Sequence, residues 1–163
     1  DGTNYFRNPS ESQYEGLGYN WRMSSITASL GISQLNKLDK IIKLRQDNAK
    51  YISKHLSKIP EITIPLIPDG SEHIHQLFTI RLKNEKIRDD LHEFLIQKQI
   101  FSKVYFKPIH LTPFYKKKFD GKEGMLPVTE NIAKTVLTLP LYPNMTLEEK
   151  KYLIDSINEF FNR

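Results

Sequence analysis

Apolar side chains recur at helical spacing from about Ser24 to Lys58, and this long amphipathic stretch constrains the fold more than any other feature. An apolar stripe on one face of a helix must be covered by another element. Gly31 is a weak point in the stripe and Pro60 ends it, so the pattern predicts one bent helix or two helices in series. The stripe consists of Ile26, Leu30, Leu35, Leu38, Ile42, Ala49, Ile52 and Leu56.

Short strand-like runs and helical segments alternate after this stretch. Residue types that favour strands predict strands at about 62–64, 75–82, 102–105 and 137–141. Helical spacing predicts helices at about 84–98, 113–118, 127–136 and from Thr146 onward. Strands separated by helices favour an α+β fold, in which helices cover one side of a small sheet.

Three helix starts carry local signals. Asn84 is a good N-cap residue, and Pro127 suits the first turn of a helix. Thr146 and Glu149 have the spacing of a capping box, in which each side chain bonds the other residue's backbone amide. These signals predict where the helices begin.

Length and composition indicate one domain of a soluble globular protein. The chain has 163 residues, of which 39% are hydrophobic and 26% charged. It has no cysteine, which excludes disulfides, thiolate catalysis and cysteine-bound metals. We find neither a signal peptide nor an apolar run long enough to span a membrane, so we expect a cytoplasmic protein with no membrane partner.

The net charge of +5 raises nucleic acid as a partner. Basic residues, however, are spread along the helices and interleaved with acidic ones, as in 83–90. The segment 115–119 combines three lysines with flanking aromatic residues, which could stack on bases. No base-reading motif accompanies it, so an RNA-binding domain is the less favoured hypothesis and no nucleic acid partner is expected.

A short polar loop, 18–24, precedes the long helical stretch. Asn20 lies close to the start of the helix, where backbone amides and the helix dipole favour an anion. Alternatively, Asn20 and Ser24 are only turn and capping residues. Tyr19 and Trp21 are interpreted as packing aromatics.

The loop and the helix after it, Gly18-Tyr19-Asn20-Trp21-Arg22-Met23 and then Gly31 and Gln34-Leu35-Asn36-Lys37-Leu38, resemble a known family pattern. It is that of the C-terminal part of the DegT/StrS-type sugar aminotransferases, which use pyridoxal phosphate to put amino groups on nucleotide-linked keto sugars. The resemblance continues in order along the chain, through Arg45, Tyr51, 73–81, 105–111, 126–130 and 139–143.

This resemblance implies the small domain of a fold type I pyridoxal-phosphate enzyme, with a mostly antiparallel sheet entered by the long bent helix. Residues 1–23 would be a lead-in from a missing N-terminal cofactor domain, and 24–163 the C-terminal small domain. The Schiff-base lysine and the acid that holds the cofactor's pyridine nitrogen would lie in that missing domain. The chain alone is therefore expected to be inactive, with no catalytic residue of its own and exposed apolar surface on the 24–58 helix.

The resemblance also assigns binding residues. Asn20 would reach the cofactor phosphate across a homodimer interface, and Arg22 would either pair with a carboxylate or phosphate or brace the interface. Tyr105, Lys107 and His110 would lie near the mouth of the nucleotide-sugar site, where His110 would either contact the substrate or only fix its loop. In relatives, the turn at Gln99 tends to carry glycine.

No metal site is expected. His73 and His75 have a spacing that would put both on one face of a strand, but no third ligand is near them in the sequence. The alternative function is a stand-alone, non-catalytic binding module with the same fold. The sequence identifies neither the sugar and the aminated position nor the amino-acid donor.

Overall fold

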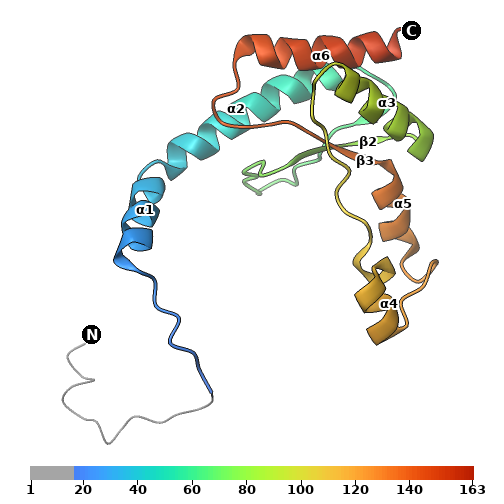
Figure 1. Ribbon diagram of the computed structural model, residues 1–163. Coiled ribbons are helices and arrows are strands. Elements are labelled where there is room, and N and C mark those ends of the chain that lie inside the picture. Colours follow the sequence, from blue (N-terminus) through green and yellow to red (C-terminus); the bar gives the residue numbers. More distant parts are fainter. Residues whose placement is uncertain (1–16) are drawn as a thin grey trace, which may run out of the picture. The chain divides into compact units, whose positions relative to one another are not determined.

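The computed structural model describes residues 17–163, and the chain divides into two compact units between Asn36 and Lys37. Helix α1 (Ser25–Leu35) belongs to the first unit, and all later helices and strands belong to the second (Figure 1). The stretch 24–58 therefore forms two helices in series. This was one of the two alternatives predicted from the sequence, the other being one bent helix.

The break between these helices lies later than the expected weak point at Gly31. Gly31 is inside α1, where glycine costs roughly 1 kcal/mol relative to alanine but is tolerated. The helix ends at Asn36, whose amide donates to the carbonyls of Ile32 and Gln34. Helix α2 (Leu38–Leu56) then starts after Lys37, whose side chain makes no capping hydrogen bond.

Helix α1 starts at Ser24, whose side-chain oxygen accepts a hydrogen bond from the Thr27 amide at 3.2 Å. None of its residues is buried. Four large apolar side chains are each at least 61% exposed, namely Ile26, Leu30, Ile32 and Leu35. The expected exposed apolar surface is thus found on α1, whereas α2 buries its own apolar face in the core.

The sheet has three antiparallel strands in the order β1 (Ile62–Thr63), β2 (Phe78–Leu82) and β3 (Val136–Leu139). In the pairing of β2 with β3, Phe78 lies opposite Leu139 and Ile80 opposite Leu137. Because side chains alternate along a strand, this register puts all four on the same face. The α+β fold with a small antiparallel sheet is confirmed.

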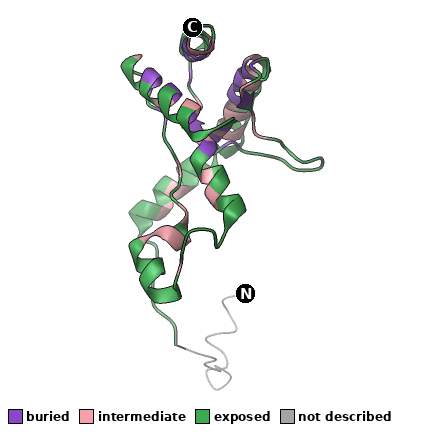
Figure 2. Cartoon of the chain, turned by 90° about the vertical axis from the view of Figure 1, so that its right-hand side faces the viewer, coloured by how far each residue is buried: buried purple, intermediate pink, exposed green. Residues whose placement is uncertain are grey.

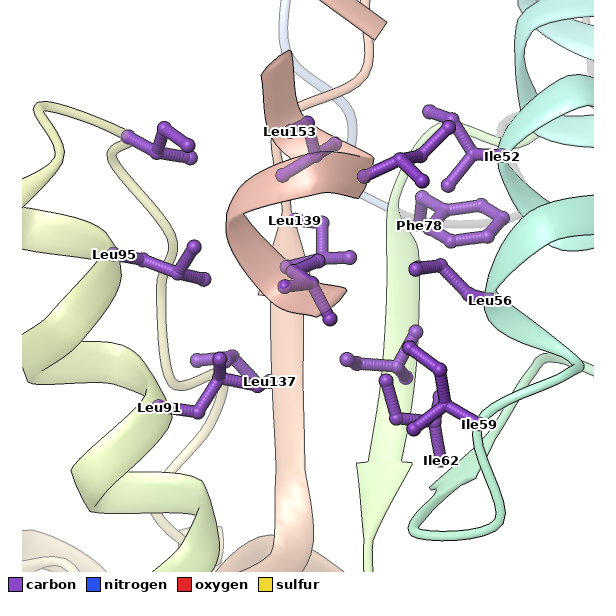
Figure 3. Close-up of a cluster of buried hydrophobic side chains, with 14 of the residues drawn as sticks. Ile52, Leu56, Ile59, Ile62, Phe78, Leu91, Leu95, Leu137, Leu139 and Leu153 are labelled. Atoms are coloured by element: carbon purple, nitrogen blue, oxygen red, sulfur yellow. The ribbon is translucent and has the colours of Figure 1, made fainter. Parts of the chain in front are cut away.

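Three helices cover that face of the sheet: α2, α3 (Glu85–Gln97) and α6 (Leu147–Phe161) (Figure 1). Burial of one large apolar side chain contributes about 1.5–3 kcal/mol. The side chains that meet in this core include Ile52, Leu56, Phe78, Leu91, Leu95, Leu137, Leu139 and Leu153 (Figure 3).

The segment between Ser102 and β3 carries a 3₁₀ turn at Ile109–Leu111, helix α4 (Pro113–Phe119) and helix α5 (Pro127–Thr135). Within the described residues, α4 buries no side chain and α5 buries only Thr135. Figure 2 accordingly shows the buried positions gathered in the helices around the sheet.

The predicted helix starts are confirmed. The Asn84 side chain accepts from the Ile87 amide at 2.9 Å, and Thr146 and Glu149 form the complete capping box. Pro127 is in the first turn of α5. Gln99 has a φ of +60°, a left-handed conformation that favours glycine.

Two of the predicted strands are much shorter than expected. The strand at 75–82 begins only at Phe78, because His75 has a φ of +50° and the Arg45 guanidinium binds the carbonyls of His75 and Gln76. His73 and His75 therefore lie outside the strand, and the prediction that they share a strand face is wrong. The strand at 102–105 is reduced to a single bridge between Lys103 and Thr138.

Replacing Phe78, which is fully buried, should destabilise the second unit strongly. We expect Phe78→Ala to lower the free energy of unfolding by about 3–5 kcal/mol, because it leaves a cavity between the sheet and α2. Phe101→Ala is the matched control, since Phe101 is 75% exposed and its loss should change stability by less than about 0.5 kcal/mol. Urea denaturation of both variants measures the difference, and equal effects would contradict this description of the core.

Candidate functional site

The second face of the sheet carries polar side chains. Thr79 of β2 and Thr138 of β3 lie opposite each other, and their hydroxyl oxygens are 2.8 Å apart. Arg81 points the same way and donates from Nε to the Thr135 hydroxyl at 3.1 Å, which ties β2 to the end of α5. This face is the floor of a cavity.

The cavity has a volume of about 370 Å³ and lies between segment 105–109 and α5. We call it the Tyr105 cavity. One wall is Tyr105, Phe106, Lys107, Pro108 and Ile109; the other wall and the floor are Thr79, Thr129, Ile132, Ala133 and Val136.

The lining combines three kinds of group. The rings of Tyr105 and Phe106 lie 4.6 Å apart and offer flat apolar surface. Thr79 and Thr129 supply hydroxyls, and Lys107 supplies an ammonium group that pairs with no carboxylate among residues 17–163. Such a set suits a ring with polar substituents that carries an anionic group.

His110 directly follows the first wall, and its side chain faces α5. Its Nε2 lies 2.9 Å from Oε1 of Glu130, and both side chains are mostly covered, with 12% and 15% exposed. The Glu130 carboxylate also accepts from the backbone amides of Gly124 and Leu126 at 2.9 and 3.1 Å. Glu130 therefore gathers three donors from separate parts of the loop.

These donors lower the pKa of Glu130 from its usual 4.5 to about 2, the Gly124 amide being the largest cause, followed by His110 and the Leu126 amide. An ionised carboxylate can only accept hydrogen bonds, so Nε2 of His110 carries the proton. Among the described residues, Nδ1 of His75 is the one side-chain nitrogen or oxygen that is both buried and without a hydrogen bond. Nδ1 of His110 also has no hydrogen bond in this part of the chain. Because it is not a buried unpaired atom, it is in contact with solvent.

The main chain of His110 is fixed as well. A Cβ atom added at Gly121 would overlap the carbonyl oxygen of His110, so only glycine allows this close approach. Segment 110–130 is thus closed on itself by a side-chain contact and a backbone contact.

The loop that holds Asn20 and Arg22 belongs to the first unit. The Arg22 amide donates to the Asn20 carbonyl at 2.9 Å, and the rings of Tyr19 and Trp21 stack at 4.8 Å. Both residues are otherwise largely exposed, by 79% and 86%, so their interpretation as packing aromatics stays a prediction. Within residues 17–163 neither the Asn20 carboxamide nor the Arg22 guanidinium has a hydrogen-bond partner.

Of the predicted binding residues, the structure brings Tyr105 and Lys107 together in one cavity. His110 is next to that cavity but bonds to Glu130. Asn20 and Arg22 lie in the other unit, and their roles stay predictions. Sequence reasoning missed Glu130, although an acidic residue in the first turn after Pro127 was an available signal.

Among residues 17–163, no group of three or more histidine, cysteine, aspartate or glutamate side chains could hold a metal ion. His73 and His75 pack edge to face, with ring centres 4.4 Å apart. No helix in that part is both long and apolar enough to cross a membrane.

Residues 2–158 match the model of the DegT/DnrJ/EryC1/StrS aminotransferase family. The chain belongs to this family. It is 32% identical over 149 residues to the UDP-4-amino-4,6-dideoxy-N-acetyl-beta-L-altrosamine transaminase of Campylobacter jejuni, covering 90% of this chain and 39% of that protein. It is 29% identical over 151 residues to the spore coat polysaccharide biosynthesis protein SpsC of Bacillus subtilis, again covering 90% and 39%.

Solved structures agree in fold. DesV of S. venezuelae superposes with a TM-score of 0.83 at 28% identity, over 99% of this chain and 44% of that one. This chain therefore spans about two fifths of the length of the relatives it matches. Aminotransferases of the family depend on pyridoxal phosphate.

The ionised state of Glu130 should make part of the stability depend on pH. Because its pKa is lower in the folded chain, its contribution is complete above about pH 4.5 and is lost as the pH falls towards 2. We expect Glu130→Gln to reduce the fall in urea midpoint between pH 6 and about 2.5.

Part of the change of the urea midpoint with pH should remain in Glu130→Gln, because other carboxylates contribute to it. The Thr146 amide lowers the pKa of Glu149, and the Lys98 ammonium lowers that of Glu159. Glu123→Gln, which removes an equal charge without a hydrogen bond in the described structure, should keep the wild-type slope. A Glu130→Gln slope equal to that of wild type would contradict the assignment.

Proposed function

We propose that this chain is the C-terminal small-domain part of an aminotransferase that uses pyridoxal phosphate and acts on nucleotide-linked keto sugars. In this proposal residues 1–23 lead in from a cofactor domain, and 24–163 carry the substrate side of the site. The observation that carries it is the family match along residues 2–158. The amino donor would be an amino acid, and the working form a homodimer.

One residue of this chain, Asn20, fits a contact with the phosphate of the cofactor. Asn20 offers a neutral carboxamide donor, exposed in the loop before α1 and without a partner among residues 17–163. We infer that it donates to the phosphate held by the neighbouring subunit. When bound, pyridoxal phosphate supplies the carbonyl and amine chemistry that carries the amino group between donor and acceptor.

The Tyr105 cavity fits the second substrate. The faces of Tyr105 and Phe106 can pack against a sugar ring or a base, and Lys107 can neutralise a diphosphate oxygen. The Arg22 fork offers a bidentate contact to a phosphate or carboxylate. In this proposal these residues bind and orient the nucleotide sugar, and none of them exchanges a proton with it.

The positions of three lysines support the expectation that the isolated chain is inactive. Lys37 and Lys40 are exposed on or beside α2, and the ammonium of Lys103 lies over the Tyr105 ring at 5.6 Å. A lysine that binds the cofactor covalently needs a closed site that excludes water. All three of these lysines are exposed instead.

The first test uses the chain by itself. Purified protein mixed with pyridoxal phosphate should show only the absorbance of the free cofactor and no amino transfer, because the covalent lysine is expected elsewhere. A stoichiometric absorbance band from lysine-bound cofactor would contradict this. It would point to a lysine of this chain, with Lys107 the first to replace because it lines the cavity.

A second test separates two roles in the longer protein. Asn20→Ala should weaken cofactor retention roughly 10- to 100-fold, since it removes a hydrogen bond to a charged oxygen, on the order of 1.5–3 kcal/mol. Lys107→Ala should instead impair the half-reaction with the nucleotide sugar and spare the half-reaction with the amino donor.

Gln34→Ala on exposed α1 and Lys117→Ala on α4 are the matched controls, and both should behave as wild type. Cofactor dissociation and single-turnover rates of each half-reaction are the measurements. Unchanged cofactor retention would leave Asn20 a turn residue, and equal loss in both half-reactions would remove Lys107 from the sugar site.

A further inference from the structure

Segment 105–109, the first wall of the Tyr105 cavity, is held by few hydrogen bonds along its length. The last backbone pairing before it is at Lys103, which exchanges hydrogen bonds of 2.9 and 2.8 Å with Thr138 of β3. Between Lys103 and His110, no side chain or amide of the described structure bonds to α5 or to the sheet. The next anchor along the chain is the bond from His110 to Glu130.

The opposite wall is the face of α5 that carries Thr129, Ile132 and Ala133. Glu130 directly follows Thr129 in this helix, and His110 directly follows Ile109 of the first wall. The hydrogen bond of 2.9 Å between them therefore joins the two walls at one end of the cavity. Its length and direction set how far apart the walls lie there.

Glu130 is fixed independently of His110. Its two oxygens accept from the amides of Gly124 and Leu126, and it lies in the first turn of α5, where the helix dipole favours a negative charge. His110 depends on Glu130 for the position of its ring, whereas Glu130 keeps two partners without His110. Glu130 therefore positions the ring of His110, and His110 in turn positions the first wall of the cavity.

We propose that Glu130 is a positioning residue of the Tyr105 cavity, which acts through His110 to hold segment 105–109 against α5. The proposal rests on the proposed function only in taking this cavity as a substrate site. It makes His110 an anchor of the wall that donates the proton on its Nε2 to Glu130.

Hydrogen exchange on the 163-residue chain tests the proposal without a ligand. In Glu130→Gln we expect the Leu111 and Thr112 amides, which close the turn after the wall, to exchange about tenfold faster or more. Amides of α6 should be unchanged, which shows that the core is intact. Glu123→Gln is the control with the same change of charge. Full protection of Leu111 and Thr112 in Glu130→Gln would overturn the proposal.

Two substitutions of His110 show whether the hydrogen bond to Glu130 or the imidazole ring itself holds the wall. Glutamine can put an amide donor near the position of Nε2, whereas asparagine is too short to reach it. We expect His110→Gln to keep most of the protection at Leu111 and Thr112 and His110→Asn to lose it. Nitrogen NMR of wild type should show the His110 proton on Nε2. Equal protection in the two variants, or an Nε2 that carries no proton, would also overturn the proposal.

A ligand measurement distinguishes this proposal from the proposed function. With UDP-N-acetylglucosamine as probe, wild type should show NMR shifts at Tyr105 and Thr129, and Glu130→Gln should bind about fivefold more weakly or worse. Wild-type shifts without weakening in Glu130→Gln would count against positioning. An absence of shifts in wild type would count against the cavity as a sugar-nucleotide site, and the exchange results would then decide the role of Glu130.

Discussion

The antiparallel pairing of β2 with β3 is the constraint on which both the core and the cavity depend. Its register places Phe78 opposite Leu139 and Ile80 opposite Leu137, so one face can be covered by three helices. The same alternation directs Thr79 and Thr138 to the second face, where they join through their hydroxyls. A shift of one residue would exchange the two faces and put threonine in the core.

Local signals predicted the secondary structure well because each depends on a few neighbouring residues. Asn84, Pro127 and the Thr146–Glu149 pair each satisfy or avoid a free backbone amide at a helix start, which is independent of the rest of the fold. The break between α1 and α2 was placed too early, since a glycine inside a helix costs too little to end it.

Contacts between distant residues were beyond such reasoning. The shortened start of β2 depends on Arg45, which is thirty residues from His75 in the sequence, and periodicity contains no information on that pairing. The same applies to Glu130 and His110, which are twenty residues apart. Tyr105 and Lys107 were selected through a family resemblance, and the structure supplies the common cavity that spacing alone could not.

The contact of Arg45 with the loop before β2 has a consequence for sequence variation. Its guanidinium donates at 2.9 and 2.6 Å to the carbonyl of residue 75 and at 2.7 Å to that of residue 76. Main-chain carbonyls are present in every residue type, so these hydrogen bonds need no particular side-chain chemistry at the two positions, but the left-handed φ of +50° at residue 75 restricts which residues can present its carbonyl in this way. Lysine could not replace the planar fork that spans both oxygens. Position 45 therefore carries the chemical requirement of this contact, and position 75 carries a conformational one.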